Sequence, residues 1–347
     1  MQAYVYRSKD SSRLESWPDP EAAEESAVIA VRMTAICGTD LRAHRYGSSS
    51  ITPPRIIGHE LVGEIVRCGS AVQGFQTGDR VQVAPAIGCG ECRACRSGHA
   101  NLCDTLRTIG FQYHGSFAPY MEIPDAAFRA GNVTLIPDDM PDDLAVLAEP
   151  VACILNSHRY LDLEAADSVA VFGAGFIGCM HAEIVRALGV GTVLMLEIDP
   201  ERRRTAAQVV PEVQVLDPSD PGTPRRVAEL THGGGVDVSI VACSSGAAQR
   251  QALEMTAKLG RVSLFGGLAG RSRGFLDSNL IHYREVSVYG VHASTPQQNR
   301  DALALLQAGR LRTAAFRNNT MNLSQIDRAF ELLESGAALK ILVCPER

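Results

Sequence analysis

The stretch SVAVFGAGFIGCMHAEIVRALG, residues 168–189, decides the fold of this chain. It opens with an apolar run of the length of a buried strand, and a glycine-rich turn follows at once. Beyond the turn, apolar residues recur at helical spacing, so the stretch predicts a strand, a tight turn and a helix. The turn has the pattern G-x-G-x-x-G, which in this setting is typical of a unit that binds a dinucleotide.

Each glycine of the turn has a predicted role. Gly173 makes the turn, Gly175 lets the backbone approach a pyrophosphate, and Gly178 lets the helix pack against the strand. Phe176 and Ile177 lie at the start of the helix, where free N–H groups and the helix dipole favour an anion. We therefore predict that these residues contact the dinucleotide. The alternative is a packing turn without a ligand.

An acidic residue follows the turn at the spacing of a ribose contact. Glu197 comes nineteen residues after Gly178, at the end of the apolar run VLMLE. A carboxylate there binds the ribose hydroxyls and repels a 2′-phosphate, so it favours NAD over NADP. Asp199 is a competing candidate for this role. Arg202 and the two arginines after it keep NADP open, because any of them could bind a 2′-phosphate.

Predicted strands and helices alternate from the turn onwards. The segments VLMLEID, VDVSIVACSS and GRVSLFGGL read as strands, and PERRRTAAQVV and RQALEMTAKLG read as helices. Such alternation is typical of a parallel sheet with helices on both faces. It ends after about residue 285, where TPQQNRDALALLQAGRL predicts one more helix, and the first 150 residues read mostly as short strands and turns.

Four cysteines lie close together in GCGECRACRSGHANLC: Cys89, Cys92, Cys95 and Cys103. The spacing C-x2-C-x2-C-x7-C allows four thiolates on one loop to surround a tetrahedral zinc ion. Such a site is structural, because it leaves no coordination position open to a substrate. A disulfide would require an oxidising compartment. An iron–sulfur cluster is disfavoured because Asp104, rather than proline, follows the last cysteine.

The composition fits a globular protein of about two domains and excludes several classes. The chain has 347 residues, 21% of them charged, and a net charge of −6. The acidic balance argues against a nucleic-acid partner. No apolar stretch is long enough to span a bilayer, and the opening MQAYVYRSKD lacks the features of an export signal. We therefore expect a cytoplasmic protein without nucleic-acid or membrane partners.

A second set of potential metal ligands lies upstream of the cysteine cluster. Cys37 occurs in ICGTD, and His59 and Glu60 occur in IGHELVGE. Thiolate, imidazole and carboxylate groups all bind zinc, and three such ligands with one open position make a catalytic site. Cys37 and His59 are 22 residues apart, however, so spacing alone does not show that they meet. A buried cysteine and a surface His-Glu pair are the alternative.

Taken together, these motifs resemble the zinc-dependent medium-chain alcohol dehydrogenases, and within them the polyol (sorbitol-like) and threonine dehydrogenase branch. The matching segments are ICGTD, GHELVGEIVRCGSAVQGFQTGDRV, the cysteine cluster, HGSFAPYMEIP, LAEPVA, and GAGFIG with Glu197. They occur in the family's order, and the likeness covers essentially the whole chain.

The resemblance implies an α/β fold of two domains. Residues 1–150 would form a GroES-like, partly open β-barrel domain with a structural zinc lobe at about 86–106, completed by residues 286–347. Residues 151–285 would form a Rossmann domain with a doubly wound parallel sheet that binds NAD. Family habit also implies a homodimer or homotetramer.

The resemblance also assigns site residues. Cys37 and His59 would be ligands of a catalytic zinc, with Glu60 as a third ligand or just behind the ligands. Glu149, in AEP, would approach this metal directly or through water. Thr39 would accept the proton of the substrate hydroxyl. Further along the chain, the residues that would border the nicotinamide are Gly266 and Val291.

One position departs from the family pattern. Many members carry a histidine five residues after the ligand cysteine, as an outer step of the proton path, and here that residue is Arg42. An arginine does not shuttle protons near neutral pH. Either His44 substitutes, or protons leave through the ribose and water, or Arg42 contacts an anionic group.

The reaction implied by the resemblance is a reversible, NAD-linked oxidation of a secondary alcohol to a ketone, in an enzyme with a catalytic and a structural zinc. The substrate would be a polyol, sugar acid, cyclitol or amino alcohol. The main alternative is a metal-free NADPH quinone or enone reductase on the same scaffold, a class that lacks the cysteine, histidine and acid set. A nucleic-acid-binding zinc ribbon is disfavoured by the charge and by the glycine turn.

Overall fold

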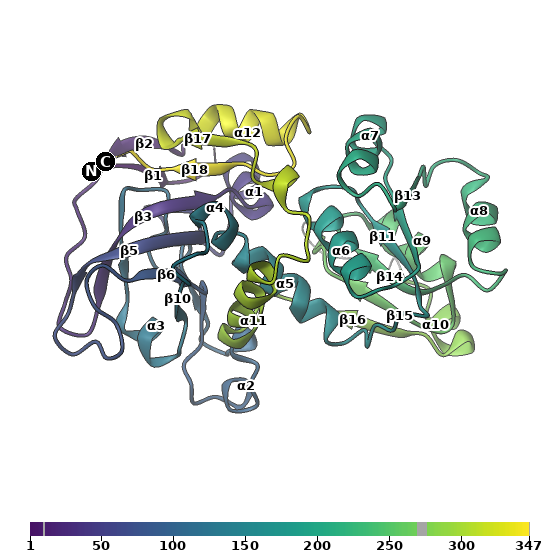
Figure 1. Cartoon of the computed structure of the whole chain (residues 1–347), viewed down its shortest axis with the longest axis horizontal. Helices are drawn as coiled ribbons and strands as arrows, with labels where there is room; N and C mark the ends of the chain where they lie inside the picture. The colour runs from purple at the N-terminus through teal and green to yellow at the C-terminus, as the bar shows by residue number, and fades with distance from the viewer. Residues whose placement is uncertain (10, 269–275, 347) are drawn as a thin grey trace. The chain divides into compact units, whose positions relative to one another are not determined.

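The chain is described by a computed structural model that covers residues 1–9, 11–268 and 276–346 (Figure 1). By their internal contacts these residues form two compact units. The first unit comprises residues 1–153, 293–309 and 313–347, and the second comprises residues 154–292 and 310–312. Each unit has its own sheet and its own apolar core.

The first unit is built around strand β3 (Ala27–Ala35). On one side β3 pairs antiparallel with β5 (Glu60–Cys68). On the other side it pairs first with β9 (Tyr120–Ile123) and then with β18 (Leu342–Cys344). The end of the chain therefore completes a sheet that the start of the chain begins. The sheet is extended at its edges by β6 (Arg80–Val83), β10 (Val133–Leu135) and β17 (Thr320–Asn322).

A smaller sheet, β2 (Arg13–Ser16), β1 (Gln2–Tyr6) and β4 (Arg55–Ile56), lies beside helix α12 (Ile326–Glu334). Tyr4, Phe117 and Phe330 are fully or almost fully buried in the core that these elements share. The other elements of the first unit are α1 (Gly38–Tyr46), β7 (Ala86–Ile87), α2 (Arg93–Arg96), η1 (Ala100–Leu102), β8 (Arg107–Thr108), α3 (Asp125–Arg129), α4 (Asp142–Ala145), α11 (Pro296–Gln307), η2 (Ala314–Phe316) and η3 (Leu323–Gln325).

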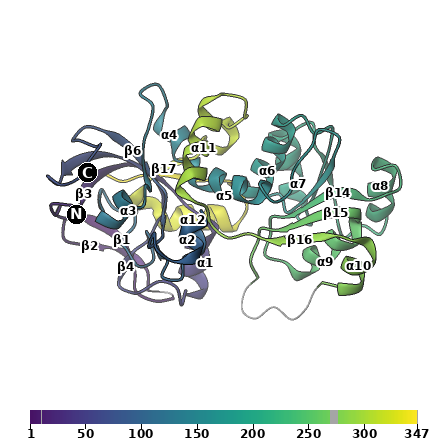
Figure 2. The same ribbon diagram turned by 90° about the horizontal axis from the view of Figure 1, so that it is seen from below.

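The second unit contains a six-stranded parallel sheet in the order β13-β12-β11-β14-β15-β16. Figure 2 shows α6 and α7 on one face of this sheet and α9 and α10 on the other. This is the doubly wound architecture that the alternating sequence predicts. Its strands are β11 (Ser168–Phe172), β12 (Thr192–Leu196), β13 (Gln214–Leu216), β14 (Val236–Val241), β15 (Thr256–Leu264) and β16 (Ser287–Gly290). Its helices are α6 (Phe176–Ala187), α7 (Pro200–Val209), α8 (Thr223–Leu230), α9 (Gly246–Met255) and α10 (Ser278–Arg284), and α5 (Ala148–His158) begins in the first unit and ends in this one.

The structure differs from the sequence prediction in two places. The helix predicted over RQALEMTAKLG ends at Met255, because Thr256 already pairs with β14 and Leu259 has a φ of 63° that no helix accommodates. The second unit also runs to residue 292 rather than 285, because β16 adds to the edge of the parallel sheet. Residues 310–312 join it as well, since Arg312 binds the buried Glu183 at 2.9 Å. Among the described residues, no helix is both long and apolar enough to cross a bilayer.

Two histidines meet inside the second unit. His158 Nε2 lies 2.9 Å from His181 Nδ1, and the ring of His181 also contacts Phe265 edge-on. Burial lowers the pKa of His158 to about 4 and the pKa of His181 well below its usual value. Both rings are therefore neutral near pH 7, because a proton on either would be placed next to the other in an apolar setting.

We expect this pair to make stability depend on pH. A depressed folded-state pKa means that the full stability is present above the usual histidine pKa of 6.5 and is lost as the pH falls towards 4. For His158 the loss between about pH 8 and pH 5 is about 2 kcal/mol. The free energy of unfolding, measured with urea at pH 8 and at pH 5, should change less in the double variant His158→Met/His181→Met than in the wild type. His282→Gln, at an exposed histidine, is the control, and equal pH dependence in all three proteins would contradict the prediction.

Candidate functional site

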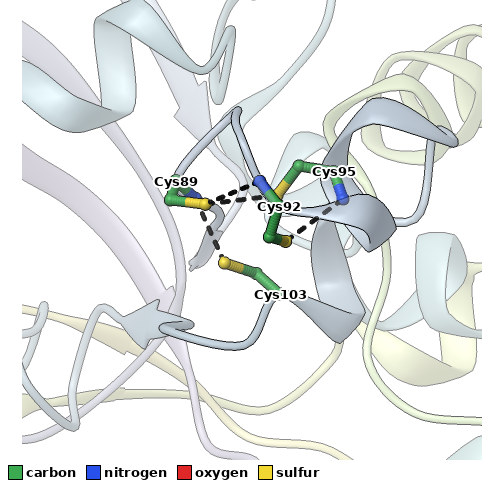
Figure 3. A group of neighbouring side chains, drawn as sticks. All are labelled: Cys89, Cys92, Cys95 and Cys103. Atoms are coloured by element: carbon green, nitrogen blue, oxygen red, sulfur yellow. Dashed lines mark hydrogen bonds between the residues drawn. The ribbon is translucent and has the colours of Figure 1, made fainter.

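The side chains of the four cysteines of the cluster come together around helix α2 (Figure 3). Cys89 follows β7, Cys92 caps the start of α2, Cys95 lies within α2, and Cys103 follows η1. All four sulfur atoms lie within 4.8 Å of one another. All ten cysteines of the chain are free thiols, so the pairing of cluster cysteines as disulfides is not seen. The arrangement fits a closed, tetrahedral thiolate site of the kind that zinc occupies.

Backbone N–H groups surround these sulfur atoms. Cys92 N and Glu91 N both point at Cys89 Sγ over 3.4 Å, and together they lower the pKa of that thiol to about 6. Burial instead raises the pKa of Cys95 to about 12. A metal ion that binds here must therefore displace a proton from Cys95, whereas Cys89 is ready to bind as the thiolate.

A second cluster forms because of the register between β3 and β5. Ala35 of β3 stands opposite Glu60 of β5. Cys37 lies two residues beyond Ala35, and His59 lies one residue before Glu60, so the antiparallel pairing brings them to the same end of the sheet. The ligand atoms of Cys37, His59 and Glu60 all lie within 4.8 Å of one another. The structure thus answers the question that their spacing in the sequence leaves open.

Gly58 holds the chain in position directly before His59. It has a φ of 93°, and a Cβ atom there would lie 2.5 Å from the ring of Phe117. Only glycine fits both the left-handed backbone and this close approach. The motif IGHE therefore requires its glycine, because only a residue without a side chain lets the backbone before His59 and Glu60 approach the ring of Phe117 so closely.

The carboxylate of Asp40 contacts both Cys37 and His59. Its Oδ2 accepts a hydrogen bond from Cys37 N over 3.0 Å, and its Oδ1 lies 3.3 Å from His59 Nδ1. That Nδ1 makes no well-aligned hydrogen bond among the described residues. Burial opposes a charged imidazolium, but the negative charges of Asp40 and Cys37 outweigh it and raise the pKa of His59 well above its usual value. A carboxylate behind a histidine in this way orients the ring for a metal.

Glu60 is held from the far side by Lys340. Lys340 Nζ donates to Glu60 Oε2 and, over 3.0 Å, to Ile36 O. The side chains of Glu60 and Lys340 are 1% and 3% exposed, so this ion pair is buried. Glu60 is thus near enough to bind a metal, but the ammonium group of Lys340 competes with the metal for its carboxylate.

Glu149 approaches the cluster from the first turn of α5. Burial raises its pKa to about 7; the charge of His59 acts to lower this pKa and the charge of Glu60 to raise it. Glu149 does not belong to the group of ligand atoms within 4.8 Å of one another. One helical turn later, Cys153 Sγ donates to Glu149 Oε1 over 3.4 Å. The carboxyl group therefore lies beside the three ligands and is anchored by a neighbouring thiol.

Helix α1 carries the predicted proton acceptor. Thr39 is two residues after Cys37, and its Oγ1 accepts a hydrogen bond from Arg42 Nη2 over 3.1 Å. His44 is turned elsewhere, since its Nδ1 is 2.9 Å from Tyr4 Oη and its ring stacks on Phe330. The structure does not bring His44 to Thr39.

The glycine turn lies in the second unit, between β11 and α6. A Cβ atom on Gly178 would lie 1.8 Å from Gly173 O, so the third glycine is required by the contact between helix and strand. Gly175 caps the helix, and Phe176 and Ile177 form its first turn. The N–H groups of that turn are the ones available to a pyrophosphate.

Glu197 follows β12 and turns back towards the glycine turn. Its Oε2 accepts from Ala174 N over 2.8 Å, and its Oε1 accepts from Asp199 N over 3.0 Å. Asp199 itself caps α7 by accepting from Arg202 N, so it is a capping residue. Arg203 pairs with Asp217 at 3.0 Å, whereas no carboxylate in the described ranges pairs with the side chain of Arg202. Of the two acids, Glu197 is the one that lies beside the glycine turn.

Gly266 and Val291 follow the neighbouring strands β15 and β16. The strands are parallel, so both residues lie at the same sheet edge as the glycine turn, where open α/β sheets bind their ligands. A Cβ atom on Gly266 would lie 2.3 Å from Cys243 O, so this glycine is also required by packing.

Two contacts at the metal cluster are absent from the sequence prediction. Lys340 is 280 residues from Glu60, and no spacing rule connects them. Its signal is the lone lysine in the apolar run AALKILV, because a lysine buried among apolar residues requires a partner. Asp40 appears in the motif ICGTD, but only the structure shows its carboxylate beneath both ligands.

The donor set fits zinc. Zinc is bound by cysteine, histidine and carboxylate in catalytic sites and by four cysteines in structural sites, and the two clusters of the first unit have these compositions. Asp40 lies 3.3 Å from His59 Nδ1, which leaves the other ring nitrogen, Nε2, for a metal, and this is the arrangement that a metal-binding histidine adopts.

Comparison with known proteins identifies the family. Residues 23–135 match the alcohol dehydrogenase GroES-like domain, and residues 177–308 match the zinc-binding dehydrogenase family. The sorbitol dehydrogenase of Halalkalibacterium halodurans is 30% identical over 331 residues, which is 94% of this chain and 94% of that protein. The L-threonine 3-dehydrogenase of Pyrococcus abyssi is 32% identical over 329 residues, covering 93% and 92% of the two chains.

The solved structures agree with this result. A zinc-binding dehydrogenase of Sinorhizobium meliloti 1021, solved with NADP bound, has a TM-score of 0.91 at 28% identity and covers 99% of each chain. The chain therefore belongs to the zinc-dependent medium-chain alcohol dehydrogenases, with the GroES-like and Rossmann architecture that the sequence predicts. It is an NAD(P)-dependent enzyme that acts on alcohols.

We expect Cys95→Ser to lower the zinc content by one ion per chain, because three thiolates no longer close the tetrahedron. Elemental analysis of the purified protein measures this, and trypsin cleavage after Arg93 or Arg96 should become faster as the lobe loosens. Cys68→Ser is the control, since this cysteine lies outside both clusters and should leave the metal content unchanged. Full zinc content in Cys95→Ser would contradict the assignment.

We expect Lys340→Met to destabilise the first unit by about 3–5 kcal/mol, because it leaves the carboxylate of Glu60 buried without its counter-charge. Urea unfolding measures the change, and Glu60→Gln in the same chain should recover part of it. Arg328→Met breaks an exposed ion pair with Glu331 and should cost less than about 1 kcal/mol. A similar small loss for Lys340→Met would show that the buried pair does not stabilise the fold.

Proposed function

We propose that this enzyme catalyses the reversible oxidation of a secondary alcohol to a ketone, with the hydride passing to NAD. Its substrate would be a small polyhydroxylated molecule: a polyol, sugar acid, cyclitol or amino alcohol. The observation that carries the proposal is the convergence of Cys37, His59 and Glu60 within 4.8 Å, with Thr39 two residues after Cys37 in the first turn of α1. The sorbitol and threonine dehydrogenases among the relatives support the substrate class.

Zinc would be held by Cys37 and His59, with Glu60 and Glu149 as the carboxylates beside it. When bound, zinc supplies the Lewis acidity that makes an alcohol acidic near neutral pH. The four cysteines Cys89, Cys92, Cys95 and Cys103 would hold a second, structural zinc. Asp40 would orient the ring of His59, and the ammonium group of Lys340 would compete with the metal for the carboxylate of Glu60.

Thr39 would accept the hydroxyl proton of the substrate. Its oxygen already accepts one hydrogen bond from Arg42, which leaves one lone pair for the substrate and the hydroxyl hydrogen for the next acceptor. Arg42 cannot take that proton, since its guanidinium is always charged. His44 is bound to Tyr4, so we propose that the proton continues through water and the ribose of the cofactor rather than through His44.

NAD would be the cofactor, bound at the Gly173–Gly178 turn with its ribose hydroxyls on Glu197. Two observations support NAD over NADP. The carboxylate of Glu197 is fixed by Ala174 N and Asp199 N beside the turn, where it would repel a 2′-phosphate. Arg203 is held by Asp217 and by the carbonyl oxygens of Glu197 and Ile198, so of the arginines that follow Asp199 it is the one least able to turn to such a phosphate, whereas Arg202 has no carboxylate partner in the described ranges. Gly266 and Val291 would border the nicotinamide, and the enzyme would assemble as a homodimer or homotetramer.

The test is a panel of polyols, sugar acids, cyclitols and amino alcohols with NAD and with NADP, read by the absorbance of the reduced cofactor. We expect activity with NAD and a loss of more than about a hundredfold in Cys37→Ala, which removes a metal ligand. Cys68→Ser is the matched control and should retain activity and zinc.

A metal-free NADPH reductase would give the opposite results. It would reduce quinones or enones with NADPH, contain no zinc, and be insensitive to Cys37→Ala. Elemental analysis in parallel with the assay therefore distinguishes the two functions, because the proposal requires zinc bound at the Cys37 cluster.

A further inference from the structure

The geometry of helix α1 places Arg42 next to the hydroxyl group of Thr39. Cys37 caps the start of α1, Thr39 lies in its first turn, and Arg42 comes three residues after Thr39 on the same face. The hydrogen bond from Arg42 Nη2 to Thr39 Oγ1, 3.1 Å long, fixes the guanidinium beside that hydroxyl. The proposed proton acceptor and a permanent positive charge are thus neighbours.

The charge of Arg42 is not neutralised by an acid. Among the residues that the structure describes, no carboxylate lies within ion-pair distance of Arg42, and its side chain is exposed. Arg45, three residues later on the same helix, is paired with Glu334 at 3.2 Å. A guanidinium has five N–H donors, and Arg42 uses one of them on Thr39. It therefore retains most of its capacity to bind an anion.

The loops that border His59 add more positive charge. Phe111 lies against the ring of His59, and its carbonyl oxygen accepts from Thr52 N over 3.3 Å, so the loops 50–57 and 107–115 are joined there. These loops carry Arg55 and Arg107. Burial, together with the charge of Arg107, lowers the pKa of Arg55, and neither arginine is paired with a carboxylate in the described part of the chain.

The chain as a whole carries a net charge of −6. Its composition therefore does not explain why Arg55 and Arg107, two residues of like charge, lie near each other. Unpaired arginines near a substrate site are instead typical of sites that bind carboxylate or phosphate groups, because the planar guanidinium matches two of their oxygens. The unpaired guanidinium of Arg42 at Thr39 therefore favours a substrate that carries a negative charge.

The reach of Arg42 limits where that group can be. A substrate hydroxyl on Thr39 and Nη2 of Arg42 are joined by two hydrogen bonds, so these two atoms are at most about 6 Å apart, and an anion bound by Arg42 lies about 3 Å from the guanidinium. An acid group attached directly to the carbinol carbon, or two or three bonds away from it, lies within this reach.

We propose that the substrate of this enzyme carries an anionic carboxylate or phosphate within about three bonds of the carbon that is oxidised, and that Arg42 binds it. This inference rests on the proposed function and narrows it from hydroxylated molecules in general to sugar acids or sugar phosphates.

The experiment compares three probes of one carbon skeleton on the zinc-loaded enzyme with NAD: sorbitol, gluconate and sorbitol 6-phosphate. We expect kcat/KM to be higher for at least one of the two acids than for sorbitol. Arg42→Gln should lower kcat/KM for that acid by about 10- to 100-fold, and by much less for sorbitol, because one charged hydrogen-bond pair is lost. Arg42→Lys should restore part of the loss, and Arg45→Gln, on the same helix, should change neither value.

A binding measurement separates this inference from the proposed function. Calorimetric titration of the protein with sorbitol 6-phosphate and with gluconate should show weaker binding in Arg42→Gln than in the wild type, and binding that weakens with added salt. If neither these probes nor any member of the panel of alcohols is oxidised, the proposed reaction fails, and the titration still tests Arg42. The inference is overturned if the wild type neither binds nor oxidises the acids better than sorbitol. The inference is also overturned if Arg42→Gln lowers kcat/KM by the same factor for all three probes, since Arg42 would then act only through Thr39.

Discussion

The pairing of β3 with β5 is the constraint on which the metal cluster depends. With Ala35 opposite Glu60, the chain leaves β3 at Cys37 and enters β5 from His59 at the same end of the sheet. A shift of one residue would turn every side chain of one strand to the other face of the sheet and would change the positions of Cys37 and His59 relative to each other. The apolar residues of both strands, such as Ile29 and Leu61, are fully buried and hold the register. The ligand geometry is therefore a product of ordinary strand packing.

Around this register the protein assembles a set of buried charges that balance one another. Asp40 faces His59, and Lys340 faces Glu60. A buried charge without a partner is strongly destabilising, whereas a hydrogen-bonded pair is tolerated. Asp40 and Lys340 thus serve two purposes: they allow the imidazole of His59 and the carboxylate of Glu60 to be buried beside the half-buried thiol of Cys37, and they hold these side chains in position. A catalytic metal site needs both, since its ligands must be rigid while one position stays open.

The sequence predicts best those features that depend on near neighbours. The glycine turn, Glu197 and the four-cysteine loop are each contained in a short segment, and each is found where the pattern indicates. The convergence of Cys37 and His59 depends on strand pairing, and residue spacing alone does not reveal it. The contact between Lys340 and Glu60 joins residues 280 positions apart, and no local sequence pattern predicts it. The helix predicted over RQALEMTAKLG is wrong beyond Met255. There, pairing of Thr256 with the parallel sheet outweighs the helical periodicity of the segment.

The last strand of the chain has a consequence for biosynthesis. Strand β18 pairs with Ala35, and Lys340 just before it supplies the counter-charge of Glu60, so the surroundings of Cys37, His59 and Glu60 include residues about 300 positions later in the sequence. A ribosome that has translated the whole parallel sheet of the second unit has still not produced this lysine. The second unit can therefore fold during synthesis before the first unit has received Lys340 and β18. A premature stop codon before residue 340 would keep Cys37, His59 and Glu60 in the chain and still leave the carboxylate of Glu60 without its counter-charge.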